Sequence, residues 1–144
     1  MHSSNDLKIF IVDDEVIYLN ILEQYIRNTG YDNITKFENG TDCLNSITDL
    51  PDVVFLDYYM DTLSGLDILR KIRQLNPNIF VVMISGQKDV KLAVDTMKKG
   101  AFDYIIKEDN VETKVKDIFQ RILKMKKTKG KSKLKSLRKI FQFL

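Results

Sequence analysis

The chain has 144 residues, 44% of them hydrophobic, which is enough for one domain whose core needs neither disulfides nor a structural metal. Its single cysteine, Cys43, excludes an internal disulfide and is expected to be a small buried hydrophobe within a helix. The N-terminus lacks the pattern of a secretory signal, and no apolar stretch is long enough to span a bilayer. A cytoplasmic location is therefore expected.

The net charge of +3 conceals two parts of opposite sign. Residues 123–144 contain nine basic and no acidic residues, whereas the preceding part contains 14 basic and 20 acidic residues. The first part therefore carries about −6 and the second +9. An acidic body argues against a general nucleic-acid-binding surface there. The basic segment could bind an anionic partner, or it could be an extension of the last helix that packs on a neighbouring molecule, or a solvated linker. Its cations are Lys124, Lys126, Lys127, Lys129, Lys131, Lys133, Lys135, Arg138 and Lys139.

Short apolar runs rich in Ile, Val and Phe alternate with segments of helical periodicity. In chain order, strands are expected at 7–12, 34–37, 53–56, 79–84 and 103–106. Helices are expected at 15–28, 41–47, 66–75, 89–99 and from residue 111 onward. This alternation predicts a doubly wound α/β fold with five parallel strands and five helices, in which all strand carboxyl ends open onto one edge.

The basic segment is expected to form an extension outside the domain. We assign residues 1–125 to the domain and 126–144 to a basic amphipathic tail or a truncated linker. Gly130 is expected to interrupt the last helix, after which apolar residues resume a helical stripe among the lysines. These apolar residues are Leu134, Leu137, Ile140, Phe141 and Leu144.

Four of the predicted strands are followed by residues able to handle phosphate or a divalent metal. They are Asp13 with Asp14, then Asp57, Ser85 and Lys107. Each could by itself be an ordinary helix cap or turn residue. Helix caps do not explain two adjacent Asp, a third Asp on another strand and a Lys on the last one. We therefore expect these five side chains to converge on one site at the carboxyl edge of the sheet.

Three carboxylates close together favour a hard divalent cation, Mg²⁺ or Mn²⁺, because the ligands are all oxygens. The only histidine is His2, near the N-terminus, so the sequence offers no zinc-type ligand set. Asp57 stands alone at the end of the middle strand and is the candidate nucleophile, since a carboxylate can attack a phosphoryl donor to form an aspartyl phosphate. Lys107, the metal and loop amides would neutralise the charge of the transferred group.

These residues resemble the receiver domain of two-component response regulators over roughly residues 6–125. The resemblance rests on the acidic trio Asp13, Asp14 and Glu15 after KIFIV, on Asp57 in VVFLDYYM, and on Met60 and Gly65 behind it. Ser85 and Gly86 after VVMI, and Tyr104 and Lys107 in KKGAFDYIIK, complete the pattern. The resemblance implies a flavodoxin-like fold and a phosphoacceptor switch that is not an enzyme.

The resemblance also implies roles for individual residues. Asp13, Asp14, Asp57 and the Tyr59 carbonyl would hold Mg²⁺, and Ser85, Gly86 and Lys107 would bind the phosphoryl group. Ser85 and Tyr104 would form the conformational switch, although a tyrosine at a strand end can also be an ordinary core residue. The donor would be a phosphohistidine on a sensor histidine kinase or phosphotransfer protein, and the downstream target would be another protein. A homodimer through the fourth helix, last strand and last helix is a further implication.

Three positions depart from the family pattern. Asp61 and Glu108 stand where family members usually have proline after Met60 and Lys107. Because a cis peptide bond is costly before a residue other than proline, the Lys107–Glu108 bond is either strained or trans, with Lys107 approaching differently. The third departure is Tyr59, a bulky residue that is expected to shield the phosphoryl group from water and slow dephosphorylation.

Other functions are open from the sequence alone. A phosphatase with an aspartyl-phosphate intermediate, as in haloacid-dehalogenase-like enzymes, would need an acid two residues after the nucleophile, where this chain has Tyr59. A receiver-like interaction module that works without phosphorylation is suggested by Glu108. The basic tail could itself be the effector, binding an acidic membrane or nucleic acid.

Overall fold

The structure, a computed structural model, describes residues 6–108 and 110–142, apart from the side chains of 131–134, 136 and 141–142. Within this range, parallel strands form one sheet with the order β2-β1-β3-β4-β5. The strands are β1 (Ile9–Val12), β2 (Ile34–Phe37), β3 (Val53–Asp57), β4 (Phe80–Ser85) and β5 (Asp103–Ile106). The predicted five-stranded, doubly wound α/β fold is confirmed, and the predicted strand bounds lie within two residues of those observed.

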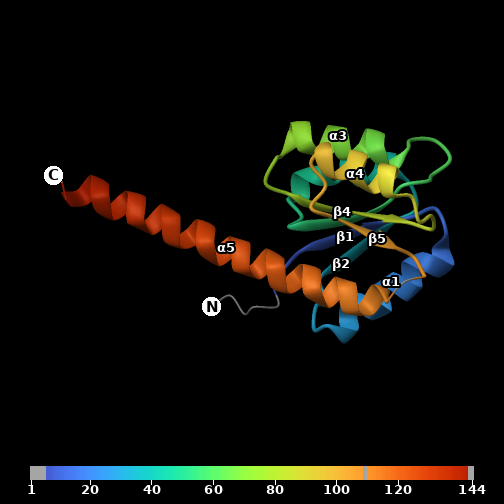
Figure 1. The fold of residues 1–144 in the computed structure, drawn as a ribbon, viewed down its shortest axis with the longest axis horizontal. Helices are drawn as coiled ribbons and strands as arrows, with labels where there is room; N and C mark the ends of the chain where they lie inside the picture. The colour runs from blue at the N-terminus through green and yellow to red at the C-terminus, as the bar shows by residue number, and fades with distance from the viewer. Residues whose placement is uncertain (1–5, 109, 143–144) are drawn as a thin grey trace.

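Helices cover both faces of the sheet. Figure 1 shows α1 and α5 on one side and α3 and α4 on the other. The helical segments are α1 (Val16–Asn28), α2 (Gly40–Asn45), the short 3-10 helix η1 (Ile47–Asp49), α3 (Gly65–Leu75), α4 (Val90–Lys98) and α5 (Val111–Gln142). Each face of the sheet therefore buries its own apolar layer.

The two layers account for the apolar runs in the strands. In β1, Ile9 and Ile11 pack in one core cluster with residues of α1 and α5. Phe10 and Val12 pack in the other cluster, with residues of α2 and α3. Because successive side chains point to opposite faces, a strand covered on both sides is apolar at every position. Cys43 belongs to the second cluster and is fully buried, as expected.

Local hydrogen bonds determine where several helices begin. The side chains of Asn39, Ser64 and Asp89 accept hydrogen bonds from backbone amides at the first turns of α2, α3 and α4. The single helix predicted at 41–47 is wrong, because α2 ends at Asn45 and η1 follows it. At the break, the Ser46 amide donates to the carbonyls of Asp42 and Cys43, which tightens the last turn.

The last helix is longer and more regular than expected. α5 runs from Val111 to Gln142 without a break, so the predicted interruption at Gly130 is wrong. A glycine within a helix costs only about 1 kcal/mol relative to alanine, which lysine-rich flanking turns of good helix formers can offset. The expected boundary between residues 125 and 126 falls inside this helix, which extends well beyond the sheet in Figure 1. Among the described residues, no helix is both long and apolar enough to cross a membrane.

Candidate phosphoryl-transfer site

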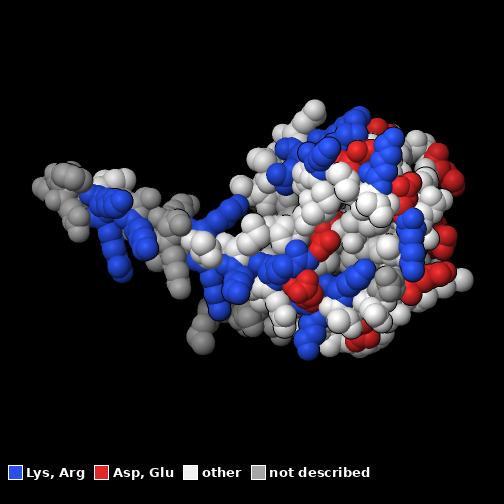
Figure 2. Space-filling model, viewed as in Figure 1, with Lys and Arg blue, Asp and Glu red and all other residues white. Residues whose placement is uncertain are grey.

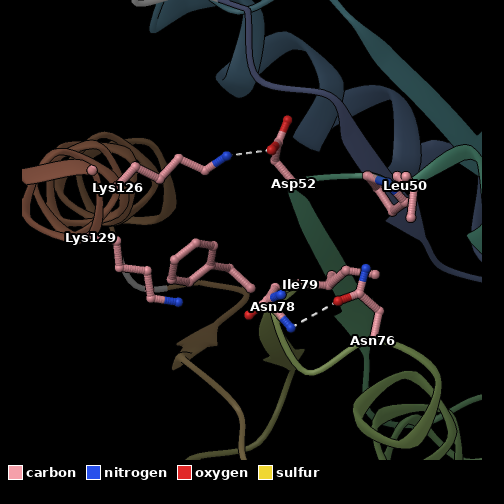
Figure 3. Close-up of a pocket in the computed structure, with 10 residues that line it drawn as sticks. Leu50, Asp52, Asn76, Asn78, Ile79, Lys126 and Lys129 are labelled. Carbon is pink, nitrogen blue, oxygen red and sulfur yellow. Dashed lines mark hydrogen bonds and ion pairs between the residues drawn. The ribbon is translucent and has the colours of Figure 1, made fainter. Parts of the chain in front are cut away.

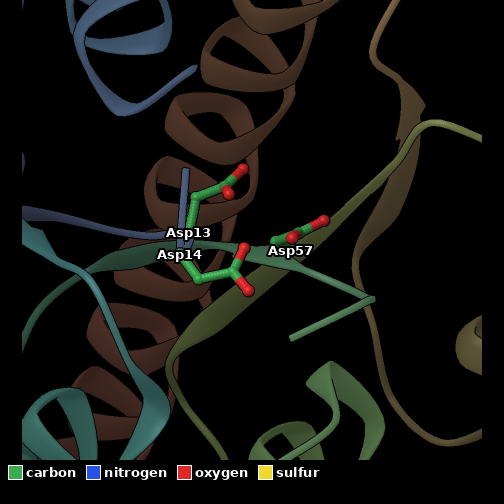
Figure 4. A group of neighbouring side chains, drawn as sticks. All are labelled: Asp13, Asp14 and Asp57. Carbon is green, nitrogen blue, oxygen red and sulfur yellow. The ribbon is translucent and has the colours of Figure 1, made fainter. Parts of the chain in front are cut away.

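The carboxyl edge of the sheet brings three acidic side chains together. One carboxylate oxygen from each of Asp13, Asp14 and Asp57 lies within 4.8 Å of the others. Figure 4 shows Asp13 and Asp14 on the segment after β1, with Asp57 beside them at the end of β3. Asp13 and Asp57 are only 2% and 4% exposed, whereas Asp14 faces solvent. Two buried carboxylates and one open side fit Mg²⁺, which keeps several of its waters when bound.

Strand pairing holds these residues in position. β1 lies between β2 and β3, so the end of β1 is where the strand order reverses and where ligands bind in such sheets. The Asp13 amide donates to the Phe37 carbonyl at 3.1 Å, which continues the pairing with β2. The Asp13 carboxylate in turn accepts a hydrogen bond from the Glu15 amide at 2.9 Å. The acidic turn is therefore ordered by the backbone before any cation binds.

Lys107 places its amine between the two buried carboxylates. Its Nζ lies 2.9 Å from Asp13 Oδ2 and 3.5 Å from Asp57 Oδ1. The Lys107 amide donates to the Ser85 carbonyl at 2.9 Å, which extends the β4–β5 pairing past the end of β5. The peptide bond between Lys107 and Glu108 is trans. A glutamate after Lys107 is thus compatible with an amine that reaches the central aspartate, without a cis bond.

Burial and charge perturb the titration of this cluster. Burial, reinforced by the neighbouring charge of Asp13, raises the pKa of Asp57 to about 7, and Lys107 only partly opposes the rise. Burial by itself would lower the pKa of Lys107, but its hydrogen bond to Asp13 and the charge of Asp57 raise it. Lys107 therefore stays protonated, while Asp57 needs additional positive charge to be fully ionised at neutral pH.

Tyr18, on α1, is a site neighbour that the sequence did not indicate. The Lys107 ammonium lies 4.4 Å from the centroid of its ring, in a cation–π contact that limits where the amine can go. The Tyr18 hydroxyl is buried and has no hydrogen-bond partner among the described residues. Burial, together with the charge of Asp13, raises the pKa of this hydroxyl. Nothing in the local pattern distinguishes Tyr18 from an ordinary apolar helix position.

In the loop after β4, Gln87 forms hydrogen bonds with Ser85, Tyr104 and Tyr59. Ser85 is fully buried and its Oγ accepts a hydrogen bond from the Gln87 amide at 3.2 Å. The Tyr104 hydroxyl donates to the Gln87 carbonyl at 3.2 Å, and the Tyr59 hydroxyl donates to the Gln87 side-chain oxygen at 3.3 Å. Tyr104 is therefore more than a core aromatic. Sequence reasoning did not identify Gln87, because its role depends on loops that meet only in the fold.

Ser85 lies at the same edge as the acidic cluster. In the sheet register Asp57 pairs with Ile84, and Ser85, the next residue, pairs with Ile106. Lys107 directly follows Ile106, so Ser85 stands between the acceptor strand and the lysine. Gly86 continues from Ser85 into the loop, and a side chain added there would meet no atom within 4 Å.

Gly65 is required by the close approach of α3 to the acceptor strand. A Cβ at this position would lie 2.4 Å from the carbonyl oxygen of Asp57 and 2.8 Å from Tyr58 Cα. The Gly65 amide also donates to the Tyr58 carbonyl at 2.8 Å. These contacts hold the loop that carries Tyr59 against the end of β3. Tyr59 itself is 51% exposed, with its ring against that of Tyr58.

Comparison with protein families matches residues 9–119 to the response regulator receiver domain. Chemotaxis protein CheY of Listeria monocytogenes is 31% identical over 102 residues, which cover 70% of this chain and 86% of CheY. The transcriptional regulatory protein ZraR of Klebsiella oxytoca is 32% identical over 106 residues, which cover 73% of this chain. The match spans only 24% of ZraR.

Solved structures give the same result. A response regulator receiver domain protein from Clostridium thermocellum superposes with a TM-score of 0.77 at 30% identity, covering 85% of this chain and 98% of that one. The receiver domain of NtrX from Brucella abortus gives a TM-score of 0.74, also at 30% identity, over 81% of this chain and 98% of that one.

Proposed function

The chain belongs to the response regulator receiver domain family, and on that premise we propose that Asp57 accepts a phosphoryl group from a histidine kinase or phosphotransfer protein. The observation that carries the proposal is the arrangement around Asp57. Its carboxylate is buried, lies 3.5 Å from the Lys107 amine, and shares a cluster with Asp13 and Asp14. Phosphoryl transfer depends mainly on positioning and charge neutralisation, and this cluster supplies both.

In the proposed reaction, an Asp57 carboxylate oxygen attacks the phosphorus of a phosphohistidine. The P–N bond breaks, its electron pair leaves with the imidazole nitrogen, and an aspartyl phosphate forms. No general base would be needed once a bound cation keeps Asp57 ionised, because the nucleophile is then an anion. A bound Mg²⁺ or Mn²⁺, held by Asp13, Asp14 and Asp57 with the Tyr59 carbonyl as a further ligand, would neutralise charge on the transferred group.

Lys107 is the residue that we expect to respond first to the new charge. Its amine already lies between Asp13 and Asp57, so a phosphoryl oxygen added to Asp57 would be within reach of the same ammonium. The Ser85 hydroxyl and the Gly86 amide are proposed as further donors to the phosphoryl group. Together these groups would hold the negative charge that Asp57 gains.

The contacts of Gln87 suggest how phosphorylation would be transmitted. The Ser85 hydroxyl accepts from the Gln87 amide, and the Tyr104 hydroxyl donates to the Gln87 carbonyl. If Ser85 moves toward a phosphoryl group, the Gln87 amide loses its acceptor and the loop that holds Tyr104 is released. A local charge would thereby bias a two-state loop and aromatic side chain.

The central test is mass spectrometry after incubation with acetyl phosphate and Mg²⁺. We expect the mass of one phosphoryl group to be added, and this addition to require both Mg²⁺ and Asp57. Asp57→Asn should abolish it, whereas Asp61→Asn, which removes an exposed carboxylate four residues away, should not. Full labelling of Asp57→Asn would place the acceptor elsewhere and remove the proposal.

The donor is proposed to dock beside the acidic turn. Val16, Ile17 and Ile21, at the start of α1, are 50%, 76% and 40% exposed, forming an apolar patch next to the site. A small donor such as acetyl phosphate would not need this patch, but a protein donor would. Ile17→Glu should therefore slow transfer from the kinase and leave labelling by acetyl phosphate unchanged. Equal loss with both donors would contradict docking at this patch.

The observations do not favour two of the alternative functions raised by the sequence, the phosphatase and the phosphorylation-independent module. A phosphatase would need an acid where this chain has Tyr59, and multiple turnover on a phosphomonoester would be its signature. Glu108 suggested a module that works without phosphorylation. However, the Lys107 amine lies 3.5 Å from Asp57 although the Lys107–Glu108 peptide bond is trans. We therefore retain the phosphorylation switch.

A homodimer through α4, β5 and α5 stays a prediction. The described face combines exposed apolar residues of α4, Val90 and Val94, with Arg121 of α5, which pairs with Asp103 of β5. Analytical ultracentrifugation with and without acetyl phosphate would test it, because phosphorylation should shift the sedimentation coefficient toward that of a dimer. A monomer under both conditions would contradict it.

A further inference from the structure

The second half of α5 is a basic helix that extends past the domain. Figure 3 shows where this helix meets the domain: Lys126 pairs with Asp52 at the amino end of β3, and Lys129 lies nearby. Beyond this point the described side chains, from Lys135 to Ile140, are exposed. Figure 2 shows Lys and Arg along the extended helix and no Asp or Glu there, in contrast to the red acidic side chains on the domain.

Exposed apolar side chains accompany these cations. Leu137 and Ile140 are 45% and 58% exposed, and they lie on one side of the helix because they are three residues apart. In the sequence Leu134, Phe141 and Leu144 continue the same i, i+3, i+4, i+7 spacing. A solvated spacer has no need for such a stripe, so an apolar surface is expected to cover it.

Charge separates the possible occupants of this helix. Pairing with the same segment of a second copy would bring together two segments of +9 each, and their repulsion opposes association. Nucleic acid would neutralise the lysines through its phosphates but would leave Leu137 and Ile140 in water. An anionic lipid surface satisfies both features at once, since headgroups attract the cations and the acyl boundary takes up the apolar side chains.

We propose that the part of α5 after Gly130 docks the protein on an anionic lipid bilayer, with the side of the helix that carries Leu137 and Ile140 against the membrane. The domain has a net charge of about −6 and would be repelled by the same surface. Membrane contact would therefore be confined to the helix and would leave the carboxyl edge of the sheet in solution. This inference is independent of phosphorylation at Asp57.

The helix must bend to dock in this way. Leu137 and Ile140 follow Val115 and Ile118 by 22 residues each, about six helical turns, so the two pairs lie on the same side of α5. Val115 and Ile118 are buried in the domain core. The domain therefore lies on the same side of α5 as Leu137 and Ile140, and in a straight helix it would stand between that side and the membrane. Gly130 lies between the two pairs and is the residue where the helix bends at lowest cost. Docking is thus expected to need a hinge at Gly130.

The first experiment is vesicle co-sedimentation of the full chain. We expect binding to phosphatidylcholine vesicles that contain about 30% phosphatidylglycerol, and none to phosphatidylcholine alone. Raising NaCl from about 0.1 M to about 0.5 M should weaken binding by about tenfold or more. Failure to bind the anionic vesicles at the lower salt would overturn the proposal, whatever the outcome of phosphorylation.

Neutral substitutions separate the apolar contact from charge. Leu137→Gln with Ile140→Gln keeps every charge, and we expect vesicle binding to fall by about tenfold because two apolar side chains are lost. Met125→Gln is the matched control, because Met125 is 43% exposed on the same helix but lies near the domain. Vesicle binding of this variant should equal that of the wild type. Unchanged binding of the double variant would show that charge alone acts and would overturn the proposal.

Competing occupants and the hinge each have a distinct outcome. Tighter binding to a DNA duplex of arbitrary sequence than to the vesicles would assign the helix to nucleic acid. A dimer that the double variant dissociates would assign the helix to a second copy. Either result would overturn the proposal.

Gly130→Ala should weaken vesicle binding by making the bend at this position more costly, whereas Thr128→Ala should not. Equal binding of Gly130→Ala would contradict the hinge. Unchanged circular dichroism would exclude misfolding of these variants.

Discussion

Asp57→Asn should stabilise the protein in the absence of metal at about pH 8. The native pKa of Asp57 is raised from 3.8 to about 7, chiefly by burial. A raised pKa means that the native state binds the proton more tightly than the unfolded state. Ionisation of Asp57 therefore costs nothing well below pH 3.8, destabilises the fold increasingly between pH 3.8 and 7, and has its full effect above pH 7.

The size of the effect follows from the same pKa values. A rise of about 3 pKa units, from 3.8 to about 7, corresponds to about 4 kcal/mol at 1.36 kcal/mol per unit. Asparagine removes this penalty but also removes one partner of Lys107, which keeps its contact of 2.9 Å with Asp13. We therefore expect a net gain of about 2–4 kcal/mol in the free energy of unfolding, of which little should remain near pH 4.

Urea unfolding in EDTA, measured at several pH values between about 4 and 8, would test this expectation. Asp61→Asn is the control, because removing an exposed carboxylate should change stability by no more than about 0.5 kcal/mol. Adding Mg²⁺ should stabilise the wild type more than Asp57→Asn, since the cation binds the native carboxylates. If Asp57→Asn is no more stable than the wild type in EDTA at about pH 8, burial and repulsion do not destabilise the ionised carboxylate.

Further predictions concern three neighbours of the cluster. Tyr59→Ser should speed loss of the phosphoryl group severalfold if the tyrosine shields it from water, and an unchanged lifetime measured by mass spectrometry would exclude shielding. Tyr18→Leu should slow labelling by acetyl phosphate, because Lys107 loses a cation–π contact worth about 1 kcal/mol. Tyr18→Phe should keep that rate and raise the free energy of unfolding by about 1 kcal/mol, since it removes a buried hydroxyl without a partner; a slower rate would assign a role to the hydroxyl. Gly65→Ala should lower the free energy of unfolding by about 2 kcal/mol or more, because its Cβ would lie 2.4 Å from the Asp57 carbonyl, and wild-type stability in urea would mean that α3 can shift without cost.

Several elements of this protein could be predicted from local sequence patterns. The helix predicted at 66–75 is observed at Gly65–Leu75, before Pro77, which cannot continue it. β2 has the predicted bounds, Ile34–Phe37. The helix bounds were wrong where weak local preferences compete. At Gly130 the helix continues because one glycine costs too little to end it, and at Ser46 a tightened turn divides one predicted helix into two segments.

The sequence by itself determined the alternation of strands and helices and the strand ends that carry Asp13, Asp14, Asp57 and Lys107, because periodicity and turn residues act over a few neighbouring positions. The tertiary structure decided which of these side chains are buried, that Lys107 lies between Asp13 and Asp57, and that Gln87 joins two loops. It also decided the raised pKa of Asp57. These properties depend on distances between residues far apart in the chain, and such distances exist only once the sheet has assembled and excluded water.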